Sequence, residues 1–288
     1  MVLTPYPFGQ DQYENPSLFA SHDGFTWVVP RTISNPLVTA SGGWEAGFLN
    51  DPDMIYNPDT DQLWIYYRFA NLDILKMHLI RINPDLTVTK PVTIMEQSPW
   101  SHKDNRTRSF CMWRESSNRW HMWGGGGEVK PPYNTYYFFS TDGICWGEPQ
   151  RVLNEARIDP FQALGLSNWH MSVKPNEQER RVEFLVYSTV ISPNWIYLLS
   201  NKNNKNPIVY AECSMDSPTL FRTPVASPVL LPSKSGWDNG HVYRCSFQIV
   251  NGGDGYLYKI WYSAKGSDGQ WHIGLTEGFM GTSYKKII

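Results

Sequence analysis

Two aspartates, Asp51 and Asp53, are the best candidates in this sequence for carboxylates that act together. They stand two residues apart in Asn50-Asp-Pro-Asp53, at the start of an expected β-strand. Alternate side chains of a strand point to the same face, so the spacing predicts a carboxylate pair at a solvated strand start. Alternatively, one aspartate caps a turn and the other accepts a hydrogen bond from neighbouring backbone.

Tryptophans precede polar residues at four expected strand starts, at Trp44, Trp100, Trp169 and Trp237. Flat aromatic faces stack against the C–H faces of sugars, while carboxylates, amides and arginines bind sugar hydroxyls. The pattern therefore predicts a carbohydrate ligand. The alternative is that these tryptophans pack between neighbouring sheets.

Basic groups stand at the starts of three expected strands, at Arg108, His170 and Arg244. The two arginines could bind an acidic group of the ligand, or they could pair with Asp51 and Asp53.

A glycine run, Gly124–Gly127, is no phosphate cradle, because neither a Lys-Ser/Thr pair nor a helix follows it. It is interpreted either as a loop where backbone approaches ligand or as simple slack.

A repeating strand pattern would position all these residues. First strands are expected at 53–56, 109–113, 170–173 and 245–250, and second strands at 62–67, 119–123, 182–187 and 256–262. Together with the N-terminal segment, the repeats predict five four-stranded units, which is an all-β, five-bladed β-propeller formed as one domain by residues 1–288, with minimal helix. The innermost strand of the first unit must come from 281–288 or from sequence upstream of the chain.

The phrase Ser-x-Asp-Gly-x-x-Trp-x-x-Pro occurs twice, at 21–30 and 140–149. Glycine supplies positive φ and aspartate can bond its own backbone, so both copies are predicted to be hairpin tips between outer strands.

Composition excludes several classes of protein. Aromatic residues make up 15% and charged residues 18%, with a net charge of −2 and no basic patch, which argues against a nucleic-acid partner. No apolar run reaches the roughly 20 residues needed to cross a bilayer, and no signal peptide is evident, so we expect no membrane insertion. Cys111, Cys145, Cys213 and Cys245 lie far apart, so we expect reduced packing residues, with no metal site and no cofactor.

The Asn50-Asp-Pro-Asp53 strand start, the repeated hairpin phrase and Trp169-His170 resemble the five-bladed propellers of glycoside hydrolase families 43 and 32. Glu14-Asn-Pro-Ser17 also resembles propeller modules of bacteriophage tail and receptor-binding proteins. The first resemblance implies an Asp base or nucleophile, an orienting Asp and a Glu acid on a later strand.

Only Asp51 and Asp53 fit that set, because the later strand starts carry Arg108, His170 and Arg244. A loop residue, Glu14 or Glu128, would have to supply the acid, since glycoside hydrolysis needs two carboxyl groups about 5 to 9.5 Å apart.

Three functions are consistent with these residues. The favoured one is a non-catalytic propeller that binds a bacterial surface polysaccharide, as a tail or receptor-binding module acting from a virion or outside the cell, in an oligomer or a larger tail assembly. The alternative is a glycoside hydrolase that uses Asp51 and Asp53 with Glu14. The third is a scaffold for protein partners.

Overall fold

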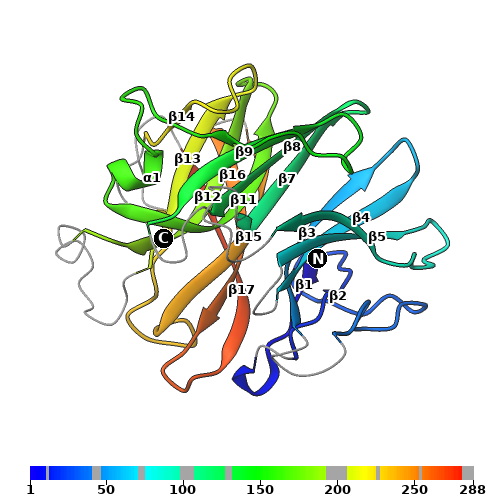
Figure 1. Ribbon diagram of the computed structural model, residues 1–288. Helices are drawn as coiled ribbons and strands as arrows, with labels where there is room; N and C mark the ends of the chain where they lie inside the picture. The colour runs from blue at the N-terminus through cyan, green and yellow to red at the C-terminus, as the bar shows by residue number, and fades with distance from the viewer. Residues whose placement is uncertain are drawn as a thin grey trace. The chain divides into compact units, whose positions relative to one another are not determined.

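The computed structural model describes residues 1–10, 13–40, 47–70, 75–97, 107–126, 132–192, 206–224, 228–252 and 255–280. Antiparallel β-sheet makes up most of this structure (Figure 1). Helix is limited, over these ranges, to η1 (Pro7–Gly9) and α1 (Pro160–Ala163), which confirms the expected low helix content. Neither helix is long and apolar enough to cross a membrane.

The strands follow one another in chain order within each sheet. The first sheet contains β3 (Phe48–Asn57), β4 (Gln62–Ala70), β5 (Leu75–Ile82) and β6 (Val92–Gln97). The second contains β7 (Thr107–Ser116), β8 (Arg119–Gly126), β9 (Asn134–Ser140) and β10 (Gln150–Arg151). The third contains β11 (Leu166–Asn176), β12 (Arg181–Val190), β13 (Ile208–Ser214) and β14 (Phe221–Arg222). The fourth contains β15 (His241–Gly252), β16 (Gly255–Lys265) and β17 (Trp271–Met280).

All eight predicted first and second strands are found, at β3, β7, β11 and β15 and at β4, β8, β12 and β16. The number of blades differs from the prediction. The described residues form four sheets of three or four strands, where the sequence predicts five blades, and a separate two-stranded sheet of β1 (Val2–Leu3) and β2 (Ser17–Leu18). Residues 281–288, the predicted source of a strand, lie outside the described residues.

Contacts divide the chain into two compact units, each described by itself below. Unit 1 contains Met1–Arg106, Arg114–His121 and Phe138–Glu148, and unit 2 contains Thr107–Trp113, Met122–Tyr137 and Pro149–Ile288. Alternating strand residues fill the core of each unit. The core of unit 1 includes Leu49, Ile65 and Ile80, and that of unit 2 includes Leu185, Tyr210, Phe247 and Ile260.

The repeated hairpin phrase folds the same way twice. The carboxylate of Asp23 accepts the backbone N–H groups of Phe25 and Thr26 at 2.8 and 2.7 Å. Asp142 accepts those of Ile144 and Cys145, both at 2.7 Å. The second copy joins β9 to β10, as predicted, and the first copy follows β2.

The structure explains why glycine is required in the glycine run, which the sequence did not indicate. Gly124–Gly126 belong to β8, so the interpretation as a loop is wrong for these residues, and Gly127 lies outside the described residues. A Cβ atom at Gly125 would lie 1.8 Å from Oδ1 of the buried Asn168. Glycine is therefore required here so that the Asn168 side chain can pack against the strand.

Candidate functional site

The first strand of three sheets carries one extra residue at the predicted strand start. Pairing shifts register between Asn50 and Asp53 in β3, between Asn168 and His170 in β11, and between Val242 and Cys245 in β15. Such β-bulges re-aim side chains and are frequent beside active sites. The residues singled out from the sequence therefore lie where the backbone departs from regular pairing.

In unit 2, the bulges of β11 and β15 bring His170 and Tyr243 together. Nε2 of His170 lies 2.5 Å from the Tyr243 hydroxyl oxygen, and the two rings meet edge to face with centroids 4.9 Å apart. His170 is buried, whereas Tyr243 is half-buried. The Trp169 ring packs against Tyr133, with centroids 5.4 Å apart, and the Ser109 hydroxyl donates to the Trp169 carbonyl oxygen.

A second imidazole and phenol pair adjoins the first. The Tyr187 ring centroid lies 4.9 Å from that of Tyr243, and its hydroxyl lies 3.0 Å from Nε2 of His241. Asn206 donates to the same hydroxyl at 2.6 Å. We call His170, Tyr187, His241 and Tyr243 the imidazole–phenol cluster.

Burial fixes the protonation of the second pair. It raises the pKa of Tyr187 to about 12, so the phenol keeps its proton at neutral pH. Burial, together with the charge of Lys265, lowers the pKa of His241 and keeps its imidazole neutral. In the tautomer that carries its proton on Nε2, His241 donates to the Tyr187 hydroxyl oxygen, which also accepts from Asn206, and Nδ1 is left to take up a proton from a reacting group.

Replacing His241 by Gln is expected to reduce the loss of stability in acid. Because the folded state lowers the pKa of His241, the unfolded chain binds this proton more readily once the pH falls below about 6.5. The free energy of unfolding should therefore fall between about pH 7.5 and 5, and the part due to His241 should be missing from the variant. Urea unfolding at several pH values measures this. His78 and His121 also have lowered pKa values, but they contribute equally to the wild type and the variant. Any difference in pH dependence between the two proteins is therefore due to His241. The same pH dependence in both would contradict the prediction.

In unit 1, Asp51 is buried, which corrects the expectation of a solvated strand start. Its carboxylate lies 3.0 Å from the guanidinium of Arg68, which also donates to Asn50 at 2.8 Å. Asp53 accepts the backbone N–H of Met54 at 2.9 Å. The bulge and the positive φ of Asp51 (51°) interrupt strand alternation, so the argument that Asp51 and Asp53 must share a face fails.

Glu14 lies close to this bulge through its backbone. Its carbonyl oxygen accepts the N–H of Leu49, at the start of β3, at 3.3 Å. The structure therefore places Glu14 near the strand that carries Asp51 and Asp53.

Trp44, Trp100 and Glu128 lie outside the described residues, and Arg108 belongs to β7. Arg244 is half-buried in the β15 bulge beside Tyr243.

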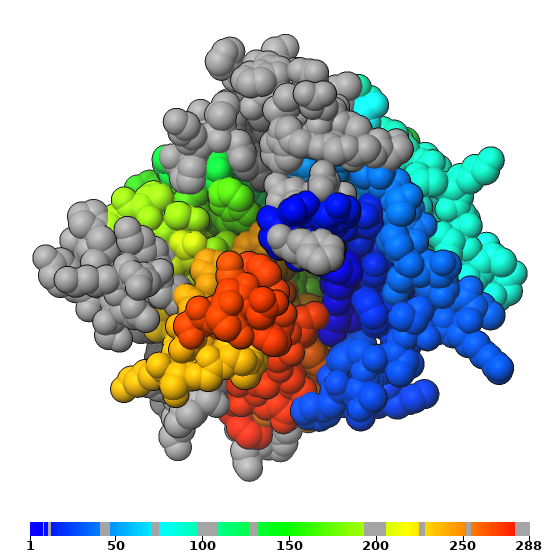
Figure 2. Space-filling view, turned by 90° about the horizontal axis from the view of Figure 1, so that it is seen from below, coloured from blue at the N-terminus to red at the C-terminus, as the bar shows by residue number. Residues whose placement is uncertain are grey.

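Trp237 is not part of the cluster. Its ring stacks on Tyr262 and meets His272 edge on, whereas Trp271 contacts His241 and Tyr243. Trp271 and His272 are adjacent in β17 and so point to opposite faces of the sheet. Figure 2 shows the segment before β15, in yellow to orange, on the surface beside β16 and β17 in orange to red.

Sequence reasoning missed Tyr187, Asn206, His241 and Tyr243. A signal was present for Tyr187, because it ends the second strand predicted at 182–187, and the structure pairs it with His170. At the start of β15 the sequence pointed to Arg244 rather than to the imidazole and the phenol just before it. Among the side chains that the structure describes, no group of three or more His, Cys, Asp or Glu could hold a metal ion.

Comparison with known proteins shows which fold this chain shares. The A type blood N-acetyl-α-D-galactosamine deacetylase of Flavonifractor plautii is 28% identical to the chain over 93% of its residues. A solved N-acetylgalactosamine deacetylase from F. plautii, in complex with blood group B trisaccharide, superposes with a TM-score of 0.77 at 21% identity, covering 96% of this chain and 84% of that one. The chain is an all-β propeller. No family model matches it.

Other solved relatives are more distant carbohydrate-active proteins. The sucrose-6-phosphate hydrolase of Lactobacillus gasseri has a TM-score of 0.63 at 14% identity and covers 98% of this chain and 56% of that one. The α-L-arabinanase of Cellvibrio cellulosa has a TM-score of 0.56 at 10% identity, covering 91% and 84%. These likenesses agree with the glycoside hydrolase resemblance at the level of fold. None of these relatives is a tail protein, so the resemblance to tail modules gains no support from them.

The extent of the match limits what the deacetylase implies. The chain spans 38% of the length of that curated protein.

Proposed function

We propose that this propeller is the catalytic module of a carbohydrate-active hydrolase that removes the N-acetyl group from an amino sugar of a glycan. The observation that carries the proposal is the contact between His170 and Tyr243, formed by two bulged strand starts. The match to a deacetylase over nearly the whole chain supports it. An enzymatic function is thereby favoured over the non-catalytic binding function.

The reaction joins water to an amide. His241, which is neutral, accepts a proton from the attacking water as its oxygen bonds to the acetyl carbonyl carbon. The amide nitrogen receives a proton from Tyr243, and the C–N bond breaks to give acetate and the free amine. Tyr243 is more exposed than His170, so solvent returns a proton to its phenolate oxygen and takes up the proton from His241, while Nε2 of His170 holds that oxygen in place.

Sugar binding falls to the aromatic side chains beside the cluster. Trp271 is 37% exposed, and its ring centroid lies 5.9 Å from that of His241 and 5.6 Å from that of Tyr243. Its open surface can stack on the sugar that carries the acetyl group.

Glycoside hydrolysis by Asp51, Asp53 and Glu14 is the second candidate. The contact of the Glu14 backbone with the start of β3 favours it, because it brings a third carboxylate residue near the bulge. In this scheme Asp51 acts as nucleophile or base, since Arg68 favours its ionised form, and Glu14 acts as the acid.

Two further features belong to the proposal. The propeller has five blades, and β1 and β2 belong to the fifth. Display in an oligomer or a tail assembly stays a prediction from the sequence.

The products distinguish these functions. The purified chain is incubated with mucin glycans, chitin oligosaccharides, arabinan and levan, and released acetate, new reducing ends and retained protein are measured together. Acetate from the N-acetylated substrates alone supports the deacetylase. Reducing ends that disappear in Asp51→Asn support the glycoside hydrolase, and retention without either product supports a binding module.

A further inference from the structure

Trp237 is exposed yet held firmly. Its side chain is 40% exposed, and its ring stacks on Tyr262 with centroids 5.4 Å apart and planes 28° apart. The ring also lies against Gly274, where a Cβ atom would come within 2.3 Å of it. The sheet therefore provides a flat surface for the indole of Trp237, formed by Tyr262 and Gly274, which we call the seat. Any side chain at position 274 would clash with the indole.

The segment that carries Trp237 is fastened on both sides. The buried carboxylate of Asp238 accepts the hydroxyl groups of Ser233 and Tyr262, each at 2.9 Å. Gly240 donates its backbone N–H to the carbonyl oxygen of Lys265 at 3.0 Å, so the segment is tied to the end of β16. The bond to Asp238 also orients the phenol on which the indole rests.

An immobilised, open indole is suited to one class of ligand. A sugar ring presents a patch of C–H groups that packs against a flat aromatic face, and a fixed ring loses little entropy on binding. Ser233, Lys234 and Ser235 are exposed just before Trp237, and they carry the donors and acceptors that hydroxyl groups require.

The seat is separate from the imidazole–phenol cluster. Tyr262, His272 and Gly274 share one face of the sheet, because Tyr262 pairs with Gly274 and His272 lies two residues from it. Trp271, which contacts His241 and Tyr243, points to the other face.

We propose that Trp237, seated on Tyr262, is a second carbohydrate-binding site that holds a hexopyranosyl residue of a polysaccharide without taking part in its hydrolysis. The site goes beyond the proposed function. It would keep the protein on a long glycan while the cluster acts on another of its residues, raising the effective concentration of substrate.

Affinity electrophoresis in gels containing mucin or glycol chitin tests this site. Trp237→Ala should weaken retention by about tenfold or more, as expected for removing a central aromatic anchor, and Trp237→Phe should weaken it less. Phe279→Ala, which removes another exposed aromatic of β17, serves as the matched control and should bind normally. Thermal unfolding of each variant identifies any loss caused by misfolding.

Measurement of acetate release distinguishes a failure of the second site from a failure of the proposed function. Acetate release from a monosaccharide substrate should be unchanged in Trp237→Ala, because a single sugar cannot occupy both sites. Unchanged retention of folded Trp237→Ala on both polymers, or an equal fall in monosaccharide turnover, would overturn the second site. If no variant or wild-type protein releases acetate but Trp237→Ala still loses retention, the proposed function fails and the second site stands.

Discussion

Tyr243→Phe is expected to lower kcat for acetate release by about 10² to 10⁴-fold, the usual contribution of a positioned acid or base. The substitution removes one oxygen, which lies 2.5 Å from Nε2 of His170. The ring remains to pack against Tyr187 and Trp271. We therefore expect the stability of the variant to fall by only about 1 to 2 kcal/mol. Steady-state kinetics and urea unfolding of the same preparations measure the two effects.

Tyr56→Phe is the matched control, because it also removes a hydrogen-bonded phenol oxygen, 2.7 Å from Asp61, but in unit 1. Its kcat should equal that of the wild type. His170→Gln should also shift the pH profile of kcat, since His170 acts through the Tyr243 hydroxyl. If Tyr243→Phe were fully active, the cluster would have no part in the reaction.

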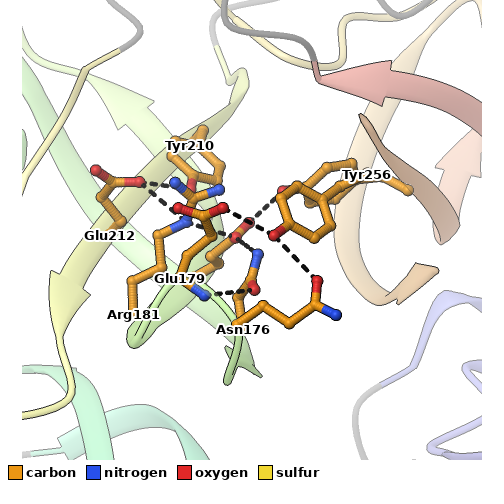
Figure 3. Close-up of polar contacts among 9 residues, drawn as sticks. Asn176, Glu179, Arg181, Tyr210, Glu212 and Tyr256 are labelled. Carbon is orange, nitrogen blue, oxygen red and sulfur yellow. Dashed lines mark hydrogen bonds and ion pairs between the residues drawn. The ribbon is translucent and has the colours of Figure 1, made fainter. Parts of the chain in front are cut away.

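Glu183→Ala is expected to cause the largest loss of stability. Glu183 is completely buried, and its carboxylate accepts from Asn176 and Arg181, each at 2.8 Å, and from the Tyr258 hydroxyl. Figure 3 shows two of these partners, Asn176 and Arg181, and Arg181 also lies 3.6 Å from Glu212. Removing the carboxylate leaves the buried donors of Asn176 and Tyr258 without their acceptor, at about 1 to 3 kcal/mol each, while the half-buried Arg181 keeps Glu212 as a partner.

Urea unfolding of three variants checks this estimate. Glu183→Gln keeps the shape and one acceptor, so it should lose less than Glu183→Ala. Glu155→Ala, which removes an exposed carboxylate 3.5 Å from Arg222, should change stability by no more than about 0.5 kcal/mol. A Glu183→Ala variant as stable as Glu155→Ala would mean that the network does not hold unit 2 together.

The strands were predictable because hydrophobic alternation and turn residues are local signals. The run Val182-Glu-Phe-Leu-Val-Tyr187 is almost continuously apolar, as expected of a strand that is buried on both faces, and the Asp-Gly phrase at 140–149 indicates the turn after β9. The number of blades was not predictable in this way, because it depends on which distant segments complete a sheet. The N-terminal segment before β3 gave the weakest strand signal, and its described residues form only the short β1–β2 pair.

The strand starts selected from the sequence are where the β-bulges lie, but of the imidazole–phenol cluster the sequence indicated only His170. A β-bulge depends on pairing with the next strand, so Asp51 and Asp53 could not be assigned to faces from their spacing alone. The contact between His170 and Tyr243 joins two strands far apart in the chain, and no local pattern reports it. The burial of Asp51 could not be predicted either, because its partner, Arg68, lies on the neighbouring strand.

Mass spectrometry of an intact trisaccharide that ends in N-acetylgalactosamine distinguishes deacetylation from glycoside hydrolysis. After incubation with the 288-residue chain, we expect a product lighter by one acetyl group, with all glycosidic bonds intact and an equal amount of free acetate. Tyr243→Phe should leave the substrate unchanged over the same time. A shortened oligosaccharide that retains its acetyl groups would contradict the account and favour glycoside hydrolysis.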